Sequence, residues 1–466
     1  MKRIALALLV LVGCSPCLET NLPMPENFTE KNRAEKLQGE MVSLATWWEQ
    51  FEDPLLNQLI MKALHKNYDL RLARERICQS RAQFGVEFSR LLPQLDADLS
   101  FSREKNSETE GDSPFLGGRF ENFYRVGFDA LWEIDIFGKN LDRARAARFN
   151  VIAQQERARD VNLSVTSEVA INYFLIRNLQ DRIHITLHHI RSAEELVETT
   201  KVRNEVGIVS ELDVFTARAL QDTRLADLAD LESRLQQTIY AIAVLLGDIP
   251  ESIQYNFDAP REKRIVSAEI PIGIPSELLC RRGDVREAEY NMLASGATVS
   301  AARKEFFPTL SFAGLYKYST SFFKEWFKAP SCFWRIRPFL ELPVFHGGEI
   351  LSKVHIATSE QRQATLEYEK TVINALQEVE TSLVAYFQEK VRIENLINQV
   401  ENYREAKASA NDLYSAGLVD FLFVFEIEKN LYSSEMAASQ SEELLRAKLV
   451  NIYKALGGGW ECSSSL

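Results

Sequence analysis

Four short stretches of the chain alternate apolar and polar residues with a period of two. They cover residues 95–102, 125–136, 310–318 and 334–342. A period of two puts one set of side chains on each face of a β-strand. The pattern therefore predicts four strands with one apolar, aromatic-rich face and one charged face. The charged face carries Asp96, Asp98, Arg125, Asp129, Arg335 and Arg337.

Each pair of predicted strands is followed by a long segment without helix-breaking residues. Residues 139–206 and 349–416 contain no glycine, and both lie within proline-free stretches. Such segments favour uninterrupted helices, and a helix of some 65 residues is about 100 Å long. Apolar residues spaced by threes and fours predict coiled-coil packing of these helices. They include Leu228, Leu231, Leu235, Ile239, Ile242 and Leu246, and also Ile393, Leu396, Val400 and Tyr403.

The two long segments end at Gly207 and Gly417, which are 210 residues apart. Glu168-Val169 and Glu378-Val379 recur with the same separation, so we interpret the chain as one structural unit used twice. Each glycine is expected to mark a tip where a long helix turns back. The predicted organisation is a leader at 1–13, a tether at 14–45, a first repeat at 46–260, a second repeat at 261–458 and a tail at 459–466.

The first residues resemble a bacterial lipoprotein signal. Two basic residues precede the apolar run 4–12, which is too short to span a bilayer, and Leu11-Val12-Gly13-Cys14 resembles a lipobox. We therefore expect residues 1–13 to be a signal peptide and Cys14 to carry the acyl chains. An ordinary signal peptide with a nearby cysteine is the alternative. Serine, rather than aspartate, after Cys14 favours the outer membrane as the destination.

Composition and isolated motifs narrow the function classes. A net charge of −12 disfavours nucleic acid and anionic lipid as partners. The cysteines other than Cys14 form no CxxC pair, so the sequence predicts neither a complete disulfide framework nor a zinc site. His184, His188 and His189 lack an HExxH pattern and are expected on a solvated helix face. With no catalytic constellation or phosphate-binding loop, we expect no enzyme activity, no metal and no cofactor.

Four strands are too few to close a barrel. Alternation alone also fits a soluble sandwich whose charged face meets water, and that alternative stays open on this feature. Strand length, aromatic content and the leader favour a membrane barrel with a wet lumen. An open sheet edge in hydrocarbon would leave backbone groups unsatisfied at several kcal/mol each. Two copies would give eight strands, whereas three give twelve with room for a channel, so we predict a trimer.

Four segments stand out between about residues 45 and 458: Trp47–Leu56, Asn67–Leu70, Phe128–Gly138 and Gly273–Arg282. They resemble the TolC-like outer-membrane factor family, in its OprM/NodT-like lipoprotein branch. One departure is Gly283, where the family usually has a proline after two arginines; we expect it to loosen a turn. The resemblance implies a trimer with a twelve-stranded barrel in the outer membrane and a twelve-helix tunnel through the periplasm. It further implies a passive exit duct for small molecules, served by a periplasmic adaptor and an inner-membrane pump.

The resemblance also implies a constriction at the helical tips. In the family an aspartate after the second turn glycine helps to line it, and Asp420 matches that position. Glu211 and Asp213 are the weaker candidates in the first half. An aspartate just before a helix also caps free backbone N–H groups, so lining and capping both remain open for Asp420.

Two other functions compete with the duct. A structural coiled-coil outer-membrane lipoprotein without channel activity would not need the four amphipathic strands. A periplasmic adaptor should carry a lipoyl-like or β-rich domain between its helices, and the sequence offers no segment of that kind. The sequence does not identify a cargo, because choice in such a system would lie with the pump.

Overall fold

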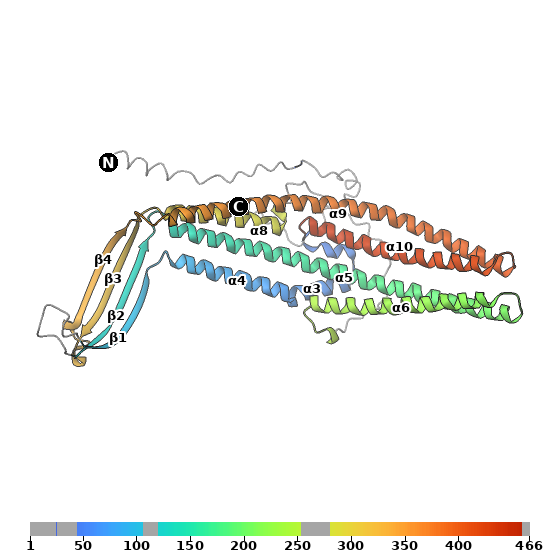
Figure 1. Cartoon of the computed structure of the whole chain (residues 1–466), viewed down its shortest axis with the longest axis horizontal. Helices are drawn as coiled ribbons and strands as arrows, with labels where there is room; N and C mark the ends of the chain where they lie inside the picture. Colours follow the sequence, from blue (N-terminus) through green and yellow to red (C-terminus); the bar gives the residue numbers. More distant parts are fainter. Residues whose placement is uncertain (1–24, 26–43, 106–119, 253–279, 459–466) are drawn as a thin grey trace. The chain divides into compact units, whose positions relative to one another are not determined.

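The computed structural model describes Pro25 and residues 44–105, 120–252 and 280–458 (Figure 1). The described chain is mostly helical, with one small antiparallel sheet, as predicted. Its elements in chain order are η3 (Leu44–Phe51), α3 (Pro54–Lys66), α4 (Tyr68–Ser89), β1 (Gln94–Lys105), β2 (Phe120–Ile134), α5 (Lys139–Glu205), α6 (Glu211–Leu245), η4 (Pro250–Ser252), α8 (Gly283–Lys304), β3 (Thr309–Thr320), η5 (Phe323–Glu325), η6 (Ala329–Ser331), β4 (Cys332–Glu341), α9 (Glu349–Ser415) and α10 (Phe421–Ala455).

Several predictions fall outside the described residues. They concern the leader at 1–13, Cys14, nearly all of the tether at 14–45, the repeat boundary at 260/261 and the tail at 459–466. Within the described residues, no helix contains a stretch that is long and apolar enough to cross a membrane. The described chain divides into two compact units. The first holds residues from 76–155 and 287–369, and the second holds residues from 44–75, 156–286 and 370–458.

The first unit contains the sheet, in the strand order β1-β2-β3-β4 with every neighbouring pair antiparallel. All four predicted strands are present. Two predicted ends lie beyond the strands, because the alternation was expected to run to Ile136 and Leu342, but β2 ends at Ile134 and β4 ends at Glu341. The Ile136 amide donates to the Ile134 carbonyl at 2.9 Å, and Gly138 follows with φ of +77°. This tight turn stops the strand just before α5 begins.

The two faces of the sheet differ in chemistry, as the alternation predicts. Residues directly opposite in the register share a face. Phe128 lies opposite both Ala97 and Tyr316, and Tyr316 lies opposite Trp334, so one apolar face extends across all four strands. This face is not covered by other parts of the described chain, since Leu99 is 70% and Trp334 is 69% exposed.

The long helices have the predicted lengths. Helices α5 and α9 each have 67 residues, and they end one residue before the predicted limits. The returning helices α6 and α10 each have 35 residues. The same order of two strands, a long helix and a shorter returning helix therefore occurs in both halves of the chain. It agrees with a repeated unit, although its boundary lies outside the described residues.

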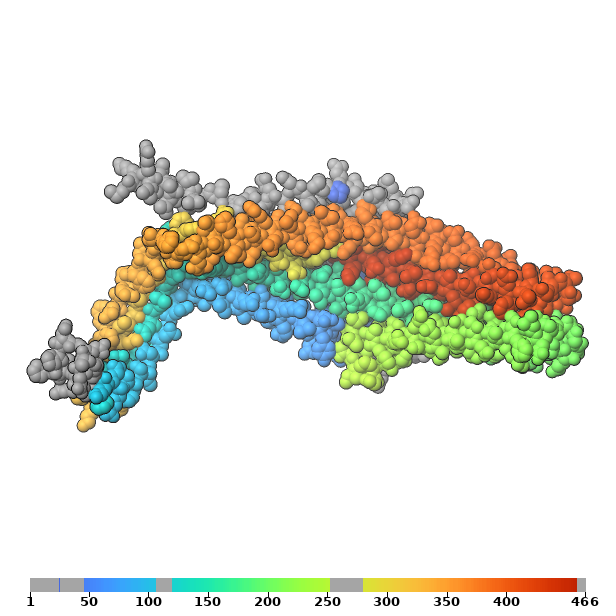
Figure 2. Space-filling model, viewed as in Figure 1, coloured from blue at the N-terminus to red at the C-terminus, as the bar shows by residue number. Residues whose placement is uncertain are grey.

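In the second unit the α5–α6 hairpin (green) and the α9–α10 hairpin (orange to red) lie against each other (Figure 2). The predicted coiled-coil positions pack as expected, with Leu231, Ile242, Ile393 and Val400 buried. Near the turns at Gly207 and Gly417, a cluster of apolar side chains joins both hairpins. Its buried members are Val197, Ala217, Ala410, Tyr414, Phe421 and Val424.

The motif that begins at Trp47 belongs to the core of the second unit. Trp47 is fully buried and stacks on Tyr453, with ring centroids 5.6 Å apart. Asp53 caps α3 by accepting the backbone amides of Leu55 and Leu56, and it also accepts a 2.5 Å hydrogen bond from Tyr173. Burial, followed by this carboxylate, raises the pKa of Tyr173 to about 12. The motif therefore anchors the start of the described chain to α5 and α10.

The motif from Trp132 to Gly138 forms the joint between β2 and α5. The Trp132 indole donates to the Leu91 carbonyl at 3.0 Å, and the Asp135 carboxylate accepts the Leu141 amide at 2.7 Å. Phe137 stacks on Phe307, with ring centroids 4.9 Å apart. These contacts tie the joint to the segments that precede β1 and β3.

Candidate functional site

Both helical tips are built around a glycine in the left-handed region. Gly207 has φ of +77° and Gly417 has φ of +75°, and no atom lies within 4 Å of an added Cβ at either position. The amides of Ile208 and Leu418 return to carbonyls five residues earlier, at 2.9 Å each. This is the hydrogen bonding of a Schellman C-terminus. Glycine is needed at these two positions because the backbone has a positive φ, whereas a larger side chain would have room there.

The acidic residues at the tips cap the returning helices. Asp420 is the N-cap of α10, and its Oδ1 accepts the Phe423 amide at 3.0 Å. Asp213 forms a capping box with Ser210 at the start of α6. The capping interpretation of Asp420 is thus observed in the structure. Its role in a constriction, with Asp213 and Glu211 as weaker candidates, stays a prediction.

Exposed apolar side chains surround the two turns. Where exposed apolar residues form a contiguous patch, they mark a contact surface for another protein or for a membrane. We refer to this set as the apolar tips. It consists of Val206, Ile208, Leu212 and Phe215 in the first hairpin, and of Leu418, Leu422 and Phe423 in the second.

The charged face of the sheet holds the six residues proposed to line a lumen. The Lys317 ammonium lies 2.7 Å from Asp98 and 2.6 Å from Asp129, so it joins three strands through ion pairs. Asp98 lies opposite Gly127, and Lys317 lies opposite the same residue from the other side. By the same register, Asp96, Arg125, Arg335 and Arg337 lie on this face too. The structure brings the six residues together, while their place in a lumen stays a prediction.

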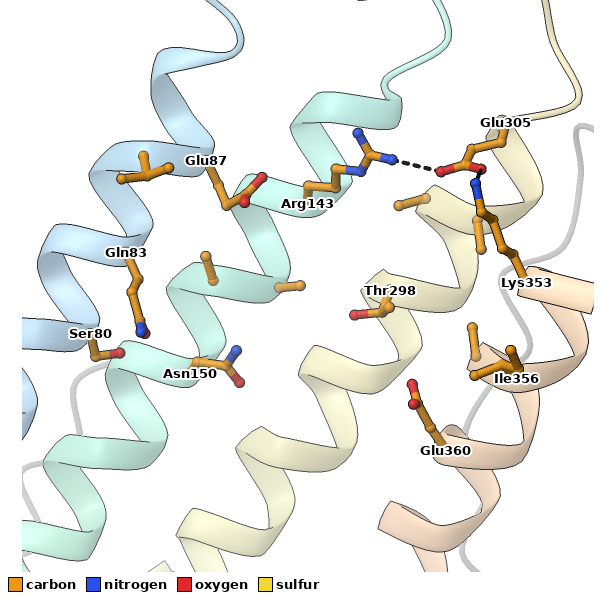
Figure 3. A pocket seen from close by; sticks show the side chains of 16 residues that line it. Ser80, Gln83, Glu87, Arg143, Asn150, Thr298, Glu305, Lys353, Ile356 and Glu360 are labelled. Atoms are coloured by element: carbon orange, nitrogen blue, oxygen red, sulfur yellow. Dashed lines mark hydrogen bonds and ion pairs between the residues drawn. The ribbon is translucent and has the colours of Figure 1, made fainter. Parts of the chain in front are cut away.

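In the same unit as the sheet, four helices line a hollow of about 630 Å³. Helices α4, α5, α8 and α9 lie side by side in that order (Figure 3). Arg143 and Lys353 point from two sides toward Glu305, at 2.6 and 3.4 Å (Figure 3). Small side chains make room for the hollow, among them Ala146, Ala147, Ala301, Ala302 and Ala357. No sequence pattern predicts this site, because its residues come from four separate helices.

One histidine prediction is wrong. His184 and His188 are exposed as expected, but His189 is only 2% exposed. Its Nδ1 lies 2.9 Å from Glu428 and its Nε2 lies 2.8 Å from Glu435, both on α10. A neutral imidazole can donate only one hydrogen bond, so two carboxylate partners require the charged form. Burial opposes that charge, but the two carboxylates outweigh burial and raise the pKa of His189.

Comparison with known proteins gives the family. A model described as "Outer membrane efflux protein" matches residues 59–248 and 274–458. The solvent efflux pump outer membrane protein SrpC of Pseudomonas putida is 29% identical over 466 residues, which cover 98% of each chain. The cation efflux system protein CusC of Escherichia coli O157:H7 is 27% identical over 459 residues, which cover 97% of each chain.

Solved structures give the same result. The outer-membrane channel OprN superimposes with a TM-score of 0.88 at 28% identity, over 96% of this chain and all of that one. The Campylobacter jejuni CmeC outer membrane channel gives a TM-score of 0.87 at 28% identity, over 96% of both chains. With these matches extending over nearly the whole length, the chain belongs to the outer membrane efflux protein family.

Proposed function

We propose that three copies of this chain form the outer-membrane exit duct of a tripartite efflux system, a passive conduit from the periplasm to the exterior. One observation carries this proposal: the sheet has four strands, an exposed apolar face and two open edges. Open edges are costly in hydrocarbon, so neighbouring copies must complete the sheet. Three copies supply twelve strands, enough for a barrel with an aqueous lumen.

The helices support the same assembly. Helix α4 leads into β1, β2 leads into α5, α8 leads into β3, and β4 leads into α9. The helix order α4, α5, α8, α9 in Figure 3 therefore matches the strand order β1 to β4. Each copy contributes four strands to a barrel and four helices to a twelve-helix tunnel.

Partners follow from the relatives and from the apolar tips. SrpC is named as the outer membrane protein of a solvent efflux pump, and CusC as part of a cation efflux system. By analogy an inner-membrane pump supplies the energy here, and a periplasmic adaptor binds the apolar tips. The acylated Cys14 would anchor the duct in the outer membrane, with the helices extending into the periplasm.

The gate is proposed at the tips. Three copies of Asp420 near a threefold axis would attract cations and narrow the resting tunnel. The test is single-channel conductance in planar bilayers. We expect Asp420→Ala combined with Asp213→Ala to raise conductance and weaken block by cations. Because these changes also remove caps, Asp420→Asn is the matched variant, since asparagine caps as well as aspartate but carries no charge. If conductance rises in the alanine variant but not in Asp420→Asn, the cause is a loosened turn and the gate is refuted.

The competing function is a structural coiled-coil lipoprotein without channel activity. A duct and a structural lipoprotein would both be helical and membrane-bound, so the measurements that distinguish them are oligomeric state and conductance. We expect the detergent-extracted protein to migrate as a heat-modifiable trimer and to conduct ions in bilayers. A protein that stays monomeric in mild detergent and does not conduct would refute the duct.

A further inference from the structure

The two open edges of the sheet carry opposite charges on the same face. On β1 the polar positions include Asp96, Asp98 and Glu104. On β4 the polar positions include Arg335 and Arg337. Asp96 and both arginines are exposed. Among the described residues none of these three has an ion-pair partner, whereas Asp98 is already paired with Lys317 within its own copy.

The direction of the strands allows these edges to meet. Three successive antiparallel pairings separate β1 from β4, so the two strands run in opposite directions. Adding β1 of a second copy to β4 therefore continues an antiparallel sheet. The polar faces of both strands then stay on the same side, provided that the register shifts only in steps of two residues.

The charges meet in any such register. Cross-strand partners interact when they are directly opposite or diagonal. If Arg335 is placed opposite any polar-face position from Gln94 to Glu104, it or Arg337 lies opposite or diagonal to Asp96 or Glu104. Pairing β1 with β1 instead would set carboxylates against carboxylates. In a β4–β4 pairing, the arginines could meet only one carboxylate on the polar face, Glu341 at the end of the strand.

We propose that these edge charges select the partner edge: Arg335 and Arg337 of one copy form ion pairs with Asp96 or Glu104 of the next, whichever carboxylate the register brings opposite or diagonal to them. These ion pairs direct head-to-tail closure of the ring. The inference rests on the proposed duct. It assigns the closure to a particular surface of this chain, with a second copy as the partner. Head-to-tail contacts that repeat around an axis close a ring, so the same ion pairs recur at each junction.

The experiment uses the full-length protein in mild detergent and follows trimer dissociation on gels over a temperature series. We expect Arg335→Glu with Arg337→Glu to lose the trimer at temperatures at which the native trimer persists. Asp96→Arg with Glu104→Arg should do the same. Combining all four changes should restore the trimer, because the charges are exchanged. Arg125→Glu is the matched control, since this arginine lies in mid-sheet opposite Ser100 and Ser319.

Disulfide trapping gives a second measurement that does not depend on stability. In a background whose cysteines other than Cys14 are replaced by serine, Arg335→Cys in one copy should crosslink to a cysteine placed at one polar-face position of β1, between Gln94 and Glu104, in another copy. The proposal is overturned if the reversals dissociate no more readily than Arg125→Glu, if exchanging all four charges fails to restore the trimer, or if a β1 cysteine crosslinks efficiently without Arg335→Cys. A native protein without a trimer would refute the proposed duct itself, so the two failures are distinguishable.

Discussion

The buried His189 offers the sharpest test of how the two hairpins are joined. It lies on α5 and bonds to Glu428 and Glu435 on α10, while Lys407 and Arg404 on α9 approach the same carboxylates at 2.7 and 2.8 Å. Removing the imidazole by His189→Ala would break both hydrogen bonds. Each carboxylate would keep its second cation, so neither charge would be left alone in the core.

The cost follows from these contacts. A hydrogen bond to a charged group contributes about 1.5–3 kcal/mol when buried, so two such bonds have a gross value of about 3–6 kcal/mol. Because Lys407 and Arg404 remain, we expect the lower end, about 3 kcal/mol. That energy corresponds to a local opening equilibrium about 100-fold larger. His188→Ala, one residue away and exposed, should change it by less than about 0.5 kcal/mol.

Hydrogen exchange measured by mass spectrometry reports this opening directly. Peptides around His189 and around Glu428 to Glu435 should exchange faster in His189→Ala, while peptides from the sheet stay unchanged. The role of a charged His189 in joining the hairpins is refuted if His189→Ala accelerates exchange no more than His188→Ala does. It is also refuted if the faster exchange extends evenly over the whole chain.

The same site gives a pH dependence of known sign. The pKa of His189 is raised above the value of about 6.5 expected in an open state, so its stabilisation is complete below pH 6.5 and is lost as pH rises through the raised pKa. Despite burial, hydrogen bonds from His189 and Arg404 lower the pKa of Glu435 to about 2, so its contribution is complete above about pH 4.3 and is lost toward pH 2. After correction for intrinsic exchange rates, the native protein should open more easily from pH 6.5 upward. His189→Ala should lack that slope.

Three further predictions use thermal unfolding monitored by circular dichroism. Gly417→Ala should destabilise the protein by about 1–2 kcal/mol, because Gly417 has a φ of +75°. Gly85→Ala should stabilise it by about 0.5–1 kcal/mol, because Gly85 lies in α4 and no atom would lie within 4 Å of its added Cβ. Equal effects of the two substitutions would refute the argument from backbone conformation. Gly127→Ala should cost about 1–3 kcal/mol, since the added Cβ would lie 2.4 Å from the Tyr316 carbonyl oxygen; unchanged stability would contradict that close approach. Asn67→Ala should cost about 0.5–2 kcal/mol, because the side chain caps α4; a neutral result would show that water replaces the cap.

The strands and long helices were predictable because their signals are local. Alternation sets the faces of a strand, and the glycines at positions 207 and 417 end helices through their own backbone conformation. The cap formed by Asp420 is equally local, since it involves an amide three residues away. The end of β2 was misplaced because Ile134 and Ile136 both fit the alternation, and only the turn before Gly138 separates them.

Contacts between distant segments could not be predicted. His189 is buried by glutamates more than 230 residues away, and an exposed neighbour such as His188 gives no local sign of the difference. The motif that ends at Arg282 also has a distant cause, since this arginine pairs with Asp284 and Glu378 and donates to the Ala455 carbonyl. At Gly283 an added Cβ would lie 2.7 Å from the Glu156 carbonyl oxygen of α5, a close approach that no sequence pattern reveals.

The matched lengths of the two hairpins restrict which insertions and deletions their helices can tolerate. Helices α5 and α9 have 67 residues each, and α6 and α10 have 35 each. Deleting one heptad from α5 alone would draw its turn back by about 10.5 Å and shift its apolar contacts with α9 and α10. Insertions or deletions in one hairpin should therefore persist only with an equal change in the other, so that the lengths of the two hairpins evolve together.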